Sequence, residues 1–324
     1  MHDTKHHTIA VNYILRRPAA LGRLIILIGF VASLVLTLSA CSDGTHVEAV
    51  DFSHRIPIDT PNTSEKDAQS LRVAVGAMIS PQQTFTYYHQ LLNYIGRRLD
   101  RPITMVQRKT YREINQMLGA GQIDLALICA GPYTSGRDQF GFKALAVPMV
   151  RGAPYYRSYL IVHRDSSFLK LEDLRGKIFA FTDPESNSGK LVPTYWLQQM
   201  DETPQTFFQR TIYSFSHDNA ILAVGQSLVD GAAVHSQVWE YLQQRNPEQT
   251  QQTRVIMTSQ EFGNPPMVAS RHLDLATQDH IQTVLLQMHQ NEGGHQILSE
   301  LMIDRFALPR EEWYLPVIEI KNAL

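Results

Sequence analysis

The segment KIFAFTDPESNSGKLVPTYWL, residues 177–197, is the part of this chain that most clearly indicates the fold class. Its first five residues are an apolar run that predicts a strand, and the polar turn Ser186–Gly189 predicts a helix that begins near Lys190. The first amides of a helix lack internal partners, and the helix dipole is positive there. The turn therefore predicts an oxyanion site, although Ser and Asn are also ordinary helix caps.

The rest of the chain continues this alternation of strands and helices. Apolar runs typical of strands fall at 71–76, 103–106, 123–128, 158–162, 211–215 and 231–234, and segments with helical apolar spacing lie between them. Strand, helix, strand at this spacing predicts βαβ units. We expect an α/β protein of two lobes, each with a mixed, mainly parallel sheet flanked by helices.

Two extended segments are candidates for crossings between the lobes. They are PYYRSYLIV, which starts at Pro154, and QEFGNPPMV, which starts at Gln260. A chain that leaves one lobe and returns to it forms a two-stranded hinge beside a cleft. The predicted division is 71–155 plus 263–324 for lobe 1 and 156–262 for lobe 2.

Residues 1–41 have the features of a lipoprotein leader. A basic start precedes the uncharged run Leu24–Leu38, and the residues Leu38–Cys41 match a lipobox that ends in the acylated Cys41. We expect cleavage before Cys41, attachment to a membrane through its lipid, and a flexible tether over 42–70. An uncleaved signal anchor and a twin-arginine export signal are the alternatives.

Composition excludes several classes of function. Removal of the leader's four basic residues and one acidic residue leaves 25 Lys+Arg of 29 and 30 Asp+Glu of 31, a charge of −5 without basic clusters, so nucleic acid is excluded. The two cysteines, Cys41 and Cys129, allow neither an internal disulfide nor a cysteine zinc cluster once Cys41 is acylated. The histidines are too scattered to predict a metal site, no GxxxxGK[ST] loop occurs, and we expect no cofactor.

The strand ends suggest further ligand groups, because ligands of open α/β sheets lie beyond the carboxyl ends of the strands. His217 follows the strand TIYSF and could donate to an anion oxygen. Tyr111 and Tyr133 could close over a ligand with their hydroxyls, and the alternative for all three is a cap or a packing role. Ser186 or Ser188 with His217 and Asp218 supplies the residue types of a hydrolase triad. No GxSxG elbow is present, so we expect a binding protein and no enzyme.

Four elements together resemble one family. They are FTDPESNSGKLVP, SHDNAILAVGQSLVDGAAVHSQVWEYL, KTYREINQMLGAGQIDLAL and the lipobox. In this combination and order they resemble the phosphate, phosphite and phosphonate substrate-binding proteins of ABC transporters, the PhnD-like group. The resemblance spans about Leu71 to Phe306 and implies the type II periplasmic-binding-protein fold, with a ligand clamped between two lobes.

The resemblance also implies site residues. The anion loop of phosphonate binders falls on Ser186, Asn187 and Ser188, with an amide in place of the middle hydroxyl, and the family's histidine falls on His217. Ligand tyrosines fall on Tyr111 and, as the nearest candidate, Tyr133.

Carboxylates that hold the ammonium group of aminophosphonates in the family fall on Gln237 and Asn264. Because a neutral amide makes a weaker contact with ammonium than a carboxylate does, we expect a small oxyanion without an amine. The expected partners are an ABC permease and the membrane, and the protein is expected to be a monomer. The alternative is a lipid-anchored sensor of the same anions that signals to a membrane histidine kinase.

Overall fold

The computed structural model describes residues 70–76 and 81–324. The leader, Cys41, the predicted tether up to residue 69 and residues 77–80 lie outside the described residues. The lipid anchor and the tether therefore stay predictions. Among the described helices, none combines the length and the apolar composition that a membrane span requires.

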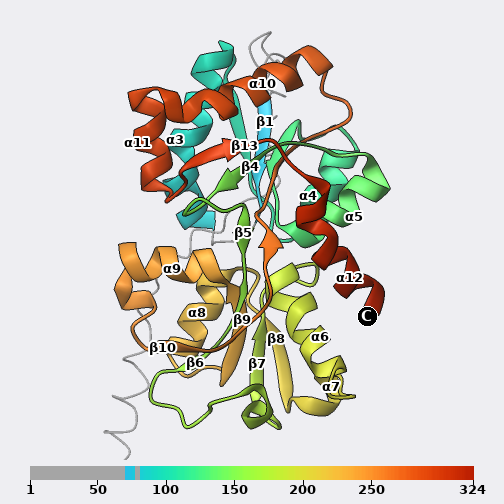
Figure 1. Ribbon diagram of the computed structural model, residues 1–324, viewed down its shortest axis with the longest axis vertical. Helices are drawn as coiled ribbons and strands as arrows, with labels where there is room; N and C mark the ends of the chain where they lie inside the picture. The colour runs from blue at the N-terminus through green and yellow to red at the C-terminus, as the bar shows by residue number, and fades with distance from the viewer. Residues whose placement is uncertain (1–69, 77–80) are drawn as a thin grey trace, which may run out of the picture. The chain divides into compact units, whose positions relative to one another are not determined.

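The first of two main sheets has six strands in the order β13-β4-β12-β3-β1-β2 (Figure 1). β1 pairs in parallel with β2 and β3, and β12 pairs antiparallel with β3 and β4. The strands β3 and β12 are buried along their length and β1 is buried except at Arg72, which explains their mainly apolar sequence. The strands are β1 Leu71–Val75, β2 Ile103–Val106, β3 Leu125–Leu127, β4 Lys143–Met149, β12 Met267–Ala269 and β13 Arg305–Ala307, and the helices around them are α3 Pro81–Leu99, α4 Tyr111–Gly119, α5 Ala130–Phe140, α10 Leu275–Gln287 and α11 Glu292–Glu300.

The second sheet has five strands in the order β10-β6-β9-β7-β8. Its strands β7, β8 and β9 are parallel to one another, whereas β6 pairs antiparallel with β9 and with β10. The sequence thus predicts the α/β class and the two mixed sheets. The strands are β6 Ser158–His163, β7 Ile178–Phe181, β8 Arg210–Tyr213, β9 Gly231–His235 and β10 Thr253–Thr258, and the helices are α6 Val192–Gln198, α7 Pro204–Phe207, α8 His217–Gly225 and α9 Ser236–Arg245.

The two segments predicted as crossings lie side by side between the sheets (Figure 1). There β5, Tyr155–Tyr156, pairs antiparallel with β11, Phe262–Gly263, so that Phe262 faces Tyr156. The last helix, α12 Leu315–Ala323, contacts both halves: Lys321 donates to Ser135 of α5, and the Ala323 carbonyl accepts from Gln198 of α6. The chain therefore links the halves at β5 and β11 and spans them again with α12.

The helix predicted near Lys190 is present, but it begins with a single π-helical turn, η2 Asn187–Leu191, and α6 starts at Val192. The wider turn begins at Ser186, whose hydroxyl oxygen accepts from the Gly189 amide at 3.0 Å. Such π turns are rare and are frequent at functional sites.

Candidate functional site

The turn between β7 and α6 buries three polar side chains. Ser186, Asn187 and Ser188 all have 0 % exposure. Gly189 is required beside them, because a Cβ at this position would lie 1.9 Å from the hydroxyl oxygen of Thr182. The hydroxyl of Ser188 and the amide oxygen of Asn187 have no hydrogen-bond partner in the described part of the chain. Ser186 is the helix cap that the sequence offered as one alternative, and its hydroxyl hydrogen is still able to donate.

His217 is the first residue of α8, and its ring is fully buried. Its Nδ1 accepts the backbone N–H of His235 at 3.0 Å, so in the neutral ring the hydrogen is on Nε2. Nε2 is buried and has no partner among the described residues. Burial lowers the pKa of His217 to about 3, which keeps the ring neutral near pH 7. His217 therefore presents one fixed N–H donor.

Tyr111 approaches from the other half of the molecule. It is the first residue of α4, which is capped by Thr110 in a reciprocal capping box with Glu113. The Tyr111 hydroxyl is buried and unpartnered in the described residues. Burial raises the pKa of this hydroxyl well above its usual value, with smaller contributions from Cys129 and Asp183, so it remains a neutral donor.

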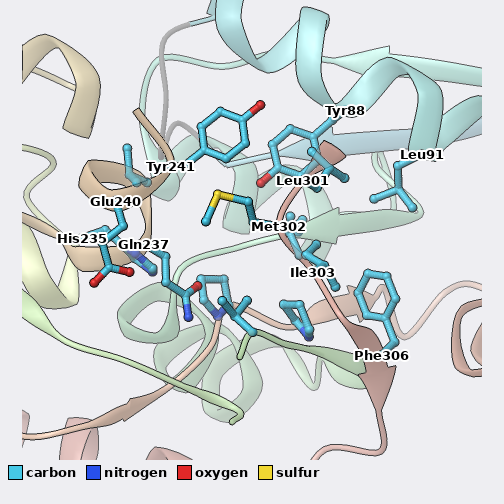
Figure 2. A pocket seen from close by; sticks show the side chains of 15 residues that line it. Tyr88, Leu91, His235, Gln237, Glu240, Tyr241, Leu301, Met302, Ile303 and Phe306 are labelled. Carbon is cyan, nitrogen blue, oxygen red and sulfur yellow. The ribbon is translucent and has the colours of Figure 1, made fainter. Parts of the chain in front are cut away.

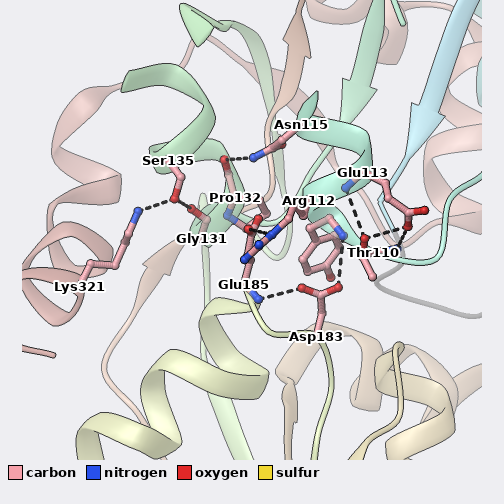
Figure 3. Close-up of polar contacts among 11 residues, drawn as sticks. Thr110, Arg112, Glu113, Asn115, Gly131, Pro132, Ser135, Asp183, Glu185 and Lys321 are labelled. Carbon is pink, nitrogen blue, oxygen red and sulfur yellow. Dashed lines mark hydrogen bonds and ion pairs between the residues drawn. The ribbon is translucent and has the colours of Figure 1, made fainter. Parts of the chain in front are cut away.

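Contacts across the two halves hold them together at this place (Figure 3). Asp183, in the turn after β7, accepts the Tyr111 backbone N–H at 3.2 Å and thus binds the N-terminus of α4. The guanidinium of Arg112 pairs with Glu185 at 3.0 Å. Gly131 of α5 lies so near the same turn that a Cβ would be 2.4 Å from the Glu185 carbonyl oxygen. The structure is therefore a closed arrangement of the halves.

Tyr156 and His235 connect these groups, and sequence reasoning did not assign either to the site. The Asn187 amide donates to the Tyr156 hydroxyl at 2.9 Å, and the Tyr156 ring stacks on the His235 ring at 3.9 Å. Both ring nitrogens of His235 are buried without a partner in the described chain. Burial and the nearby His217 lower the pKa of His235 well below its usual value. Its position at the carboxyl end of the strand GAAVH was the available signal.

Five residues at this junction of the halves carry buried atoms without a partner in the described chain, and we define them as the polar cluster: Tyr111, Asn187, Ser188, His217 and His235. An unsatisfied buried polar group costs about 1–3 kcal/mol, so such atoms are normally retained where a ligand satisfies them. No member is an ionised base, and each can donate a hydrogen bond from a neutral group. Three helices, α4, α5 and α8, begin here and add the positive ends of their dipoles. Neutral donors with helix N-termini suit a small oxyanion.

Three other candidate residues are placed differently. Gln237 donates to the Asn264 side-chain oxygen and to the Tyr155 carbonyl, both at 2.9 Å, and Asn264 donates to the Pro148 carbonyl at 2.8 Å. This amide pair therefore joins strands beside the hinge. The Tyr133 ring contacts the ring of Tyr314 at 4.7 Å and the guanidinium of Arg137, neither of which belongs to the polar cluster.

The geometry does not support a hydrolase triad. The Ser188 hydroxyl and the His217 Nε2 are both unpartnered in the described chain, so the two are not hydrogen-bonded to each other. The Nδ1 of His217 accepts a backbone N–H where a triad needs a carboxylate partner. Within residues 70–76 and 81–324, no group of three or more potential ligands could hold a metal ion.

Two α/β halves, a two-stranded hinge and a buried polar cluster between the halves define a ligand-binding protein of the type II periplasmic class. Solved structures share this fold. A binding protein component of an ABC phosphonate transporter from Pseudomonas aeruginosa superposes with a TM-score of 0.74 at 24 % identity, over 78 % of this chain and 85 % of that one. PhnD1 from Prochlorococcus marinus, solved in complex with methylphosphonate, gives 0.71 at 21 % identity, over 79 % and 98 %.

Comparison of the sequence with known protein families identifies the family. The model of the family described as "ABC transporter, phosphonate, periplasmic substrate-binding protein" matches residues 73–314, and the chain belongs to this family. The phosphonates-binding periplasmic protein of Escherichia coli (strain K12) is 25 % identical over 247 residues, 75 % of this chain and 73 % of that protein. The phosphate-import protein PhnD of Mycolicibacterium smegmatis is 24 % identical over 214 residues, 62 % and 66 %. The predicted family is confirmed, and its members are transport proteins that bind substrate, so this chain is not an enzyme.

Proposed function

We propose that this protein captures a phosphonate, phosphite or phosphate anion between its two halves and delivers it to an ABC permease. The observation that carries the proposal is the polar cluster, in which donors from both halves are buried and have no hydrogen-bond partner among the described residues. The hydroxyls of Ser188 and Tyr111 and the Nε2–H of His217 would donate to anion oxygens. The hydroxyl of Ser186 would add a donor next to them.

Asn187 would distinguish protonatable oxyanions from sulfate. Its amide oxygen is an unpartnered acceptor, and a monoprotonated phosphonate or phosphate carries an O–H that can donate to it. Sulfate has no such hydrogen near pH 7. A half turn of the amide would instead let the Tyr156 hydroxyl donate to the oxygen and direct the NH₂ group toward the ligand.

Binding would proceed by closure of two lobes, residues 71–155 plus 263–324 and residues 156–262, about the β5–β11 hinge. In the open form water could hydrate the donors, and ligand would favour the closed form by its differential affinity. The contacts of Asp183 with Tyr111 and of Glu185 with Arg112 would add to the closed state. Gln237 and Asn264 would act at the hinge rather than on the anion, and Tyr133 would pack against Tyr314.

A thermal-shift and calorimetry screen tests the proposal. Phosphate, phosphite and methylphosphonate are compared with sulfate on the purified protein. A ligand at 100 times its Kd stabilises the folded state by about 2.7 kcal/mol, which raises the melting temperature by several degrees. At least one of the three should do so, and sulfate should bind more weakly. Failure of all three would contradict the proposal.

The remaining part of the proposal concerns the membrane. Acylation of Cys41 would hold the monomeric protein at the outer face of a membrane, near its permease. A Cys41→Ser variant should be released from the membrane fraction and should not incorporate labelled palmitate, whereas a Ser42→Ala control should keep both properties. A membrane-bound, unlabelled wild type would indicate an uncleaved anchor.

A further inference from the structure

Two cavities are lined by both halves of the molecule, and they differ in charge. The first has a volume of about 100 Å³ and a mainly apolar wall that includes Leu91 and Phe306 (Figure 2). The charged residue in this wall is the carboxylate Glu240, and its described lining residues include no Lys or Arg. An anion is poorly stabilised by apolar groups and is repelled by a carboxylate. This cavity therefore offers an anion no attractive route to the polar cluster.

The second cavity lies next to the polar cluster and has a volume of about 410 Å³. It is lined by residues 107–109 of one half and by Asn219 and residues 214–216 of the other. His217 directly follows the segment 214–216, and Tyr111 follows the segment 107–109 after one residue. Because consecutive Cα atoms are only about 3.8 Å apart, the cavity borders two donors of the cluster, one from each half.

A cation–π contact joins the halves at this cavity. The Lys109 ammonium lies over the Phe215 ring, 4.1 Å from its centroid. A cation within about 6 Å of a ring centroid is attracted to the ring face. Lys109 and the neighbouring Arg108 are both exposed, so two positive charges border the cavity where it meets solvent. The cavity thus has the sign of charge that attracts an anion.

The backbone of Phe215 is strained. Its φ of +59° lies in the left-handed region, which is unfavourable for a bulky side chain. The Phe215 amide donates to the Thr182 carbonyl at 2.7 Å, which holds the residue in this conformation. Phe215 is the one aromatic residue among the described non-glycine residues with positive φ. Backbone strain of this kind is concentrated at functional sites, which supports a functional role for the Phe215 ring.

We propose that Lys109 and Phe215 form a gate through which the anion reaches and leaves the polar cluster. This inference rests on the proposed function and adds to it the route and the rate of ligand exchange. When the halves open, the contact breaks, and the ammonium of Lys109 attracts the incoming anion together with Arg108. When they close, the ammonium returns to the ring and covers the bound anion. The gate therefore speeds entry by its charge and slows release by its contact.

Stopped-flow kinetics with methylphosphonate, phosphite and phosphate tests the gate. The signal is the tryptophan fluorescence of the purified protein, to which Trp313, beside Tyr155 of the hinge, contributes. Phe215→Leu removes the ring and should release the ligand about two- to fivefold faster, which corresponds to the strength of an exposed cation–π contact. Phe215→Tyr retains a ring and should release the ligand at the wild-type rate. All three side chains carry a Cβ, so the backbone strain at this position stays the same.

Lys109→Met should change both rate constants. Release should become about two- to fivefold faster, and association should become slower at low ionic strength but not at high ionic strength. A double variant with Phe215→Leu should release the ligand no faster than Phe215→Leu alone, because both substitutions remove one contact. Lys177→Met is the matched control. Lys177 lies over the Phe168 ring at 5.5 Å within one half, so its loss should change neither rate.

The outcomes separate the gate from the proposed function. If a ligand binds but Lys109→Met and Phe215→Leu both release it at the wild-type rate, the gate is overturned and the proposed function stands. The gate is also overturned if Lys177→Met speeds release as much as Lys109→Met does. If none of the three anions binds the wild type, both proposals fail. If Phe215→Leu does not fold, Lys109→Met decides alone, because it alters an exposed side chain.

Discussion

The polar cluster and the Gln237–Asn264 pair differ in whether their buried polar atoms have hydrogen-bond partners. Both are polar, and both lie between the two halves. Gln237 and Asn264 bond to each other and to backbone carbonyls, whereas Ser188 and His217 have donors without partners in the described chain. A buried polar group with partners stabilises the fold, whereas one without partners in the protein costs stability unless water or a ligand satisfies it.

Acidification should have the largest effect, through the two buried histidines of the polar cluster. The pKa of His217 is about 3 in the folded protein and about 6.5 in the unfolded chain, and that of His235 is also lowered by burial. The folded state binds fewer protons, so the free energy of unfolding should fall as pH drops from about 6.5 toward 3, by up to about 1.4 kcal/mol per pH unit for each ring.

Urea unfolding of the ligand-free protein at pH 7, 6 and 5 measures this slope, and His217→Gln should reduce it. Burial raises the pKa of Asp183, which opposes the trend, but this carboxyl is present in both proteins and its contribution cancels in the difference. Equal slopes for wild type and variant would contradict a buried neutral His217.

Gly131→Ala should hinder closure of the two halves without destabilising the fold. The added methyl would lie 2.4 Å from the Glu185 carbonyl oxygen when the halves are closed, and alanine favours the helix in which Gly131 lies. If the closed state falls to about 1 % of the population, affinity falls about 100-fold. The unfolding free energy should change little. Gly293→Ala is the control, because a Cβ there meets nothing within 4 Å, and equal affinities for the two variants would argue against closure.

Ser188→Ala should change affinity and stability in opposite directions. Loss of a hydrogen bond to a charged ligand costs about 1.5–3 kcal/mol, or roughly 10- to 150-fold in Kd by calorimetry. The ligand-free protein should become more stable by about 1 kcal/mol, because an unsatisfied buried hydroxyl is removed. Ser270→Ala is the matched control: its hydroxyl donates to the Leu118 carbonyl at 2.8 Å, so it should lose stability and keep its affinity. The reverse pattern would contradict the assignment of Ser188.

Asn264→Leu should have the smallest effect, and on stability. Loss of its bonds to Pro148 and Gln237 should reduce the free energy of unfolding by about 1 kcal/mol in urea titrations. The Kd for methylphosphonate should change by less than about threefold. A loss of affinity as large as that of Ser188→Ala would place Asn264 on the ligand and remove the distinction between the two regions.

The sequence predicts the fold better than the site. Mainly apolar strands such as β1 and β7 and the alternation with helices are enough for two mixed sheets, since burial leaves a clear pattern. Ser186, Asn187, Ser188 and His217 were predicted because they follow strand ends within a recognisable motif.

Tyr156 and His235 were missed for a physical reason. Their position in the site depends on ring stacking between residues 79 positions apart, and no local pattern encodes such a contact. The hydrogen-bond partners of Gln237 and Asn264 could not be predicted from the sequence either, because they include backbone carbonyls that the hinge brings near. Whether a buried polar group has a hydrogen-bond partner depends on the folded chain, so only the structure could show it.

The buried thiol of Cys129 has one practical consequence. Burial raises its pKa, and the group lies 4.0 Å from the Tyr156 hydroxyl at the junction of the two halves. Alkylating reagents can reach this sulfur only when the halves separate. The rate at which a maleimide labels Cys129 therefore reports how often the halves open, or for what fraction of the time they are open, without an engineered probe.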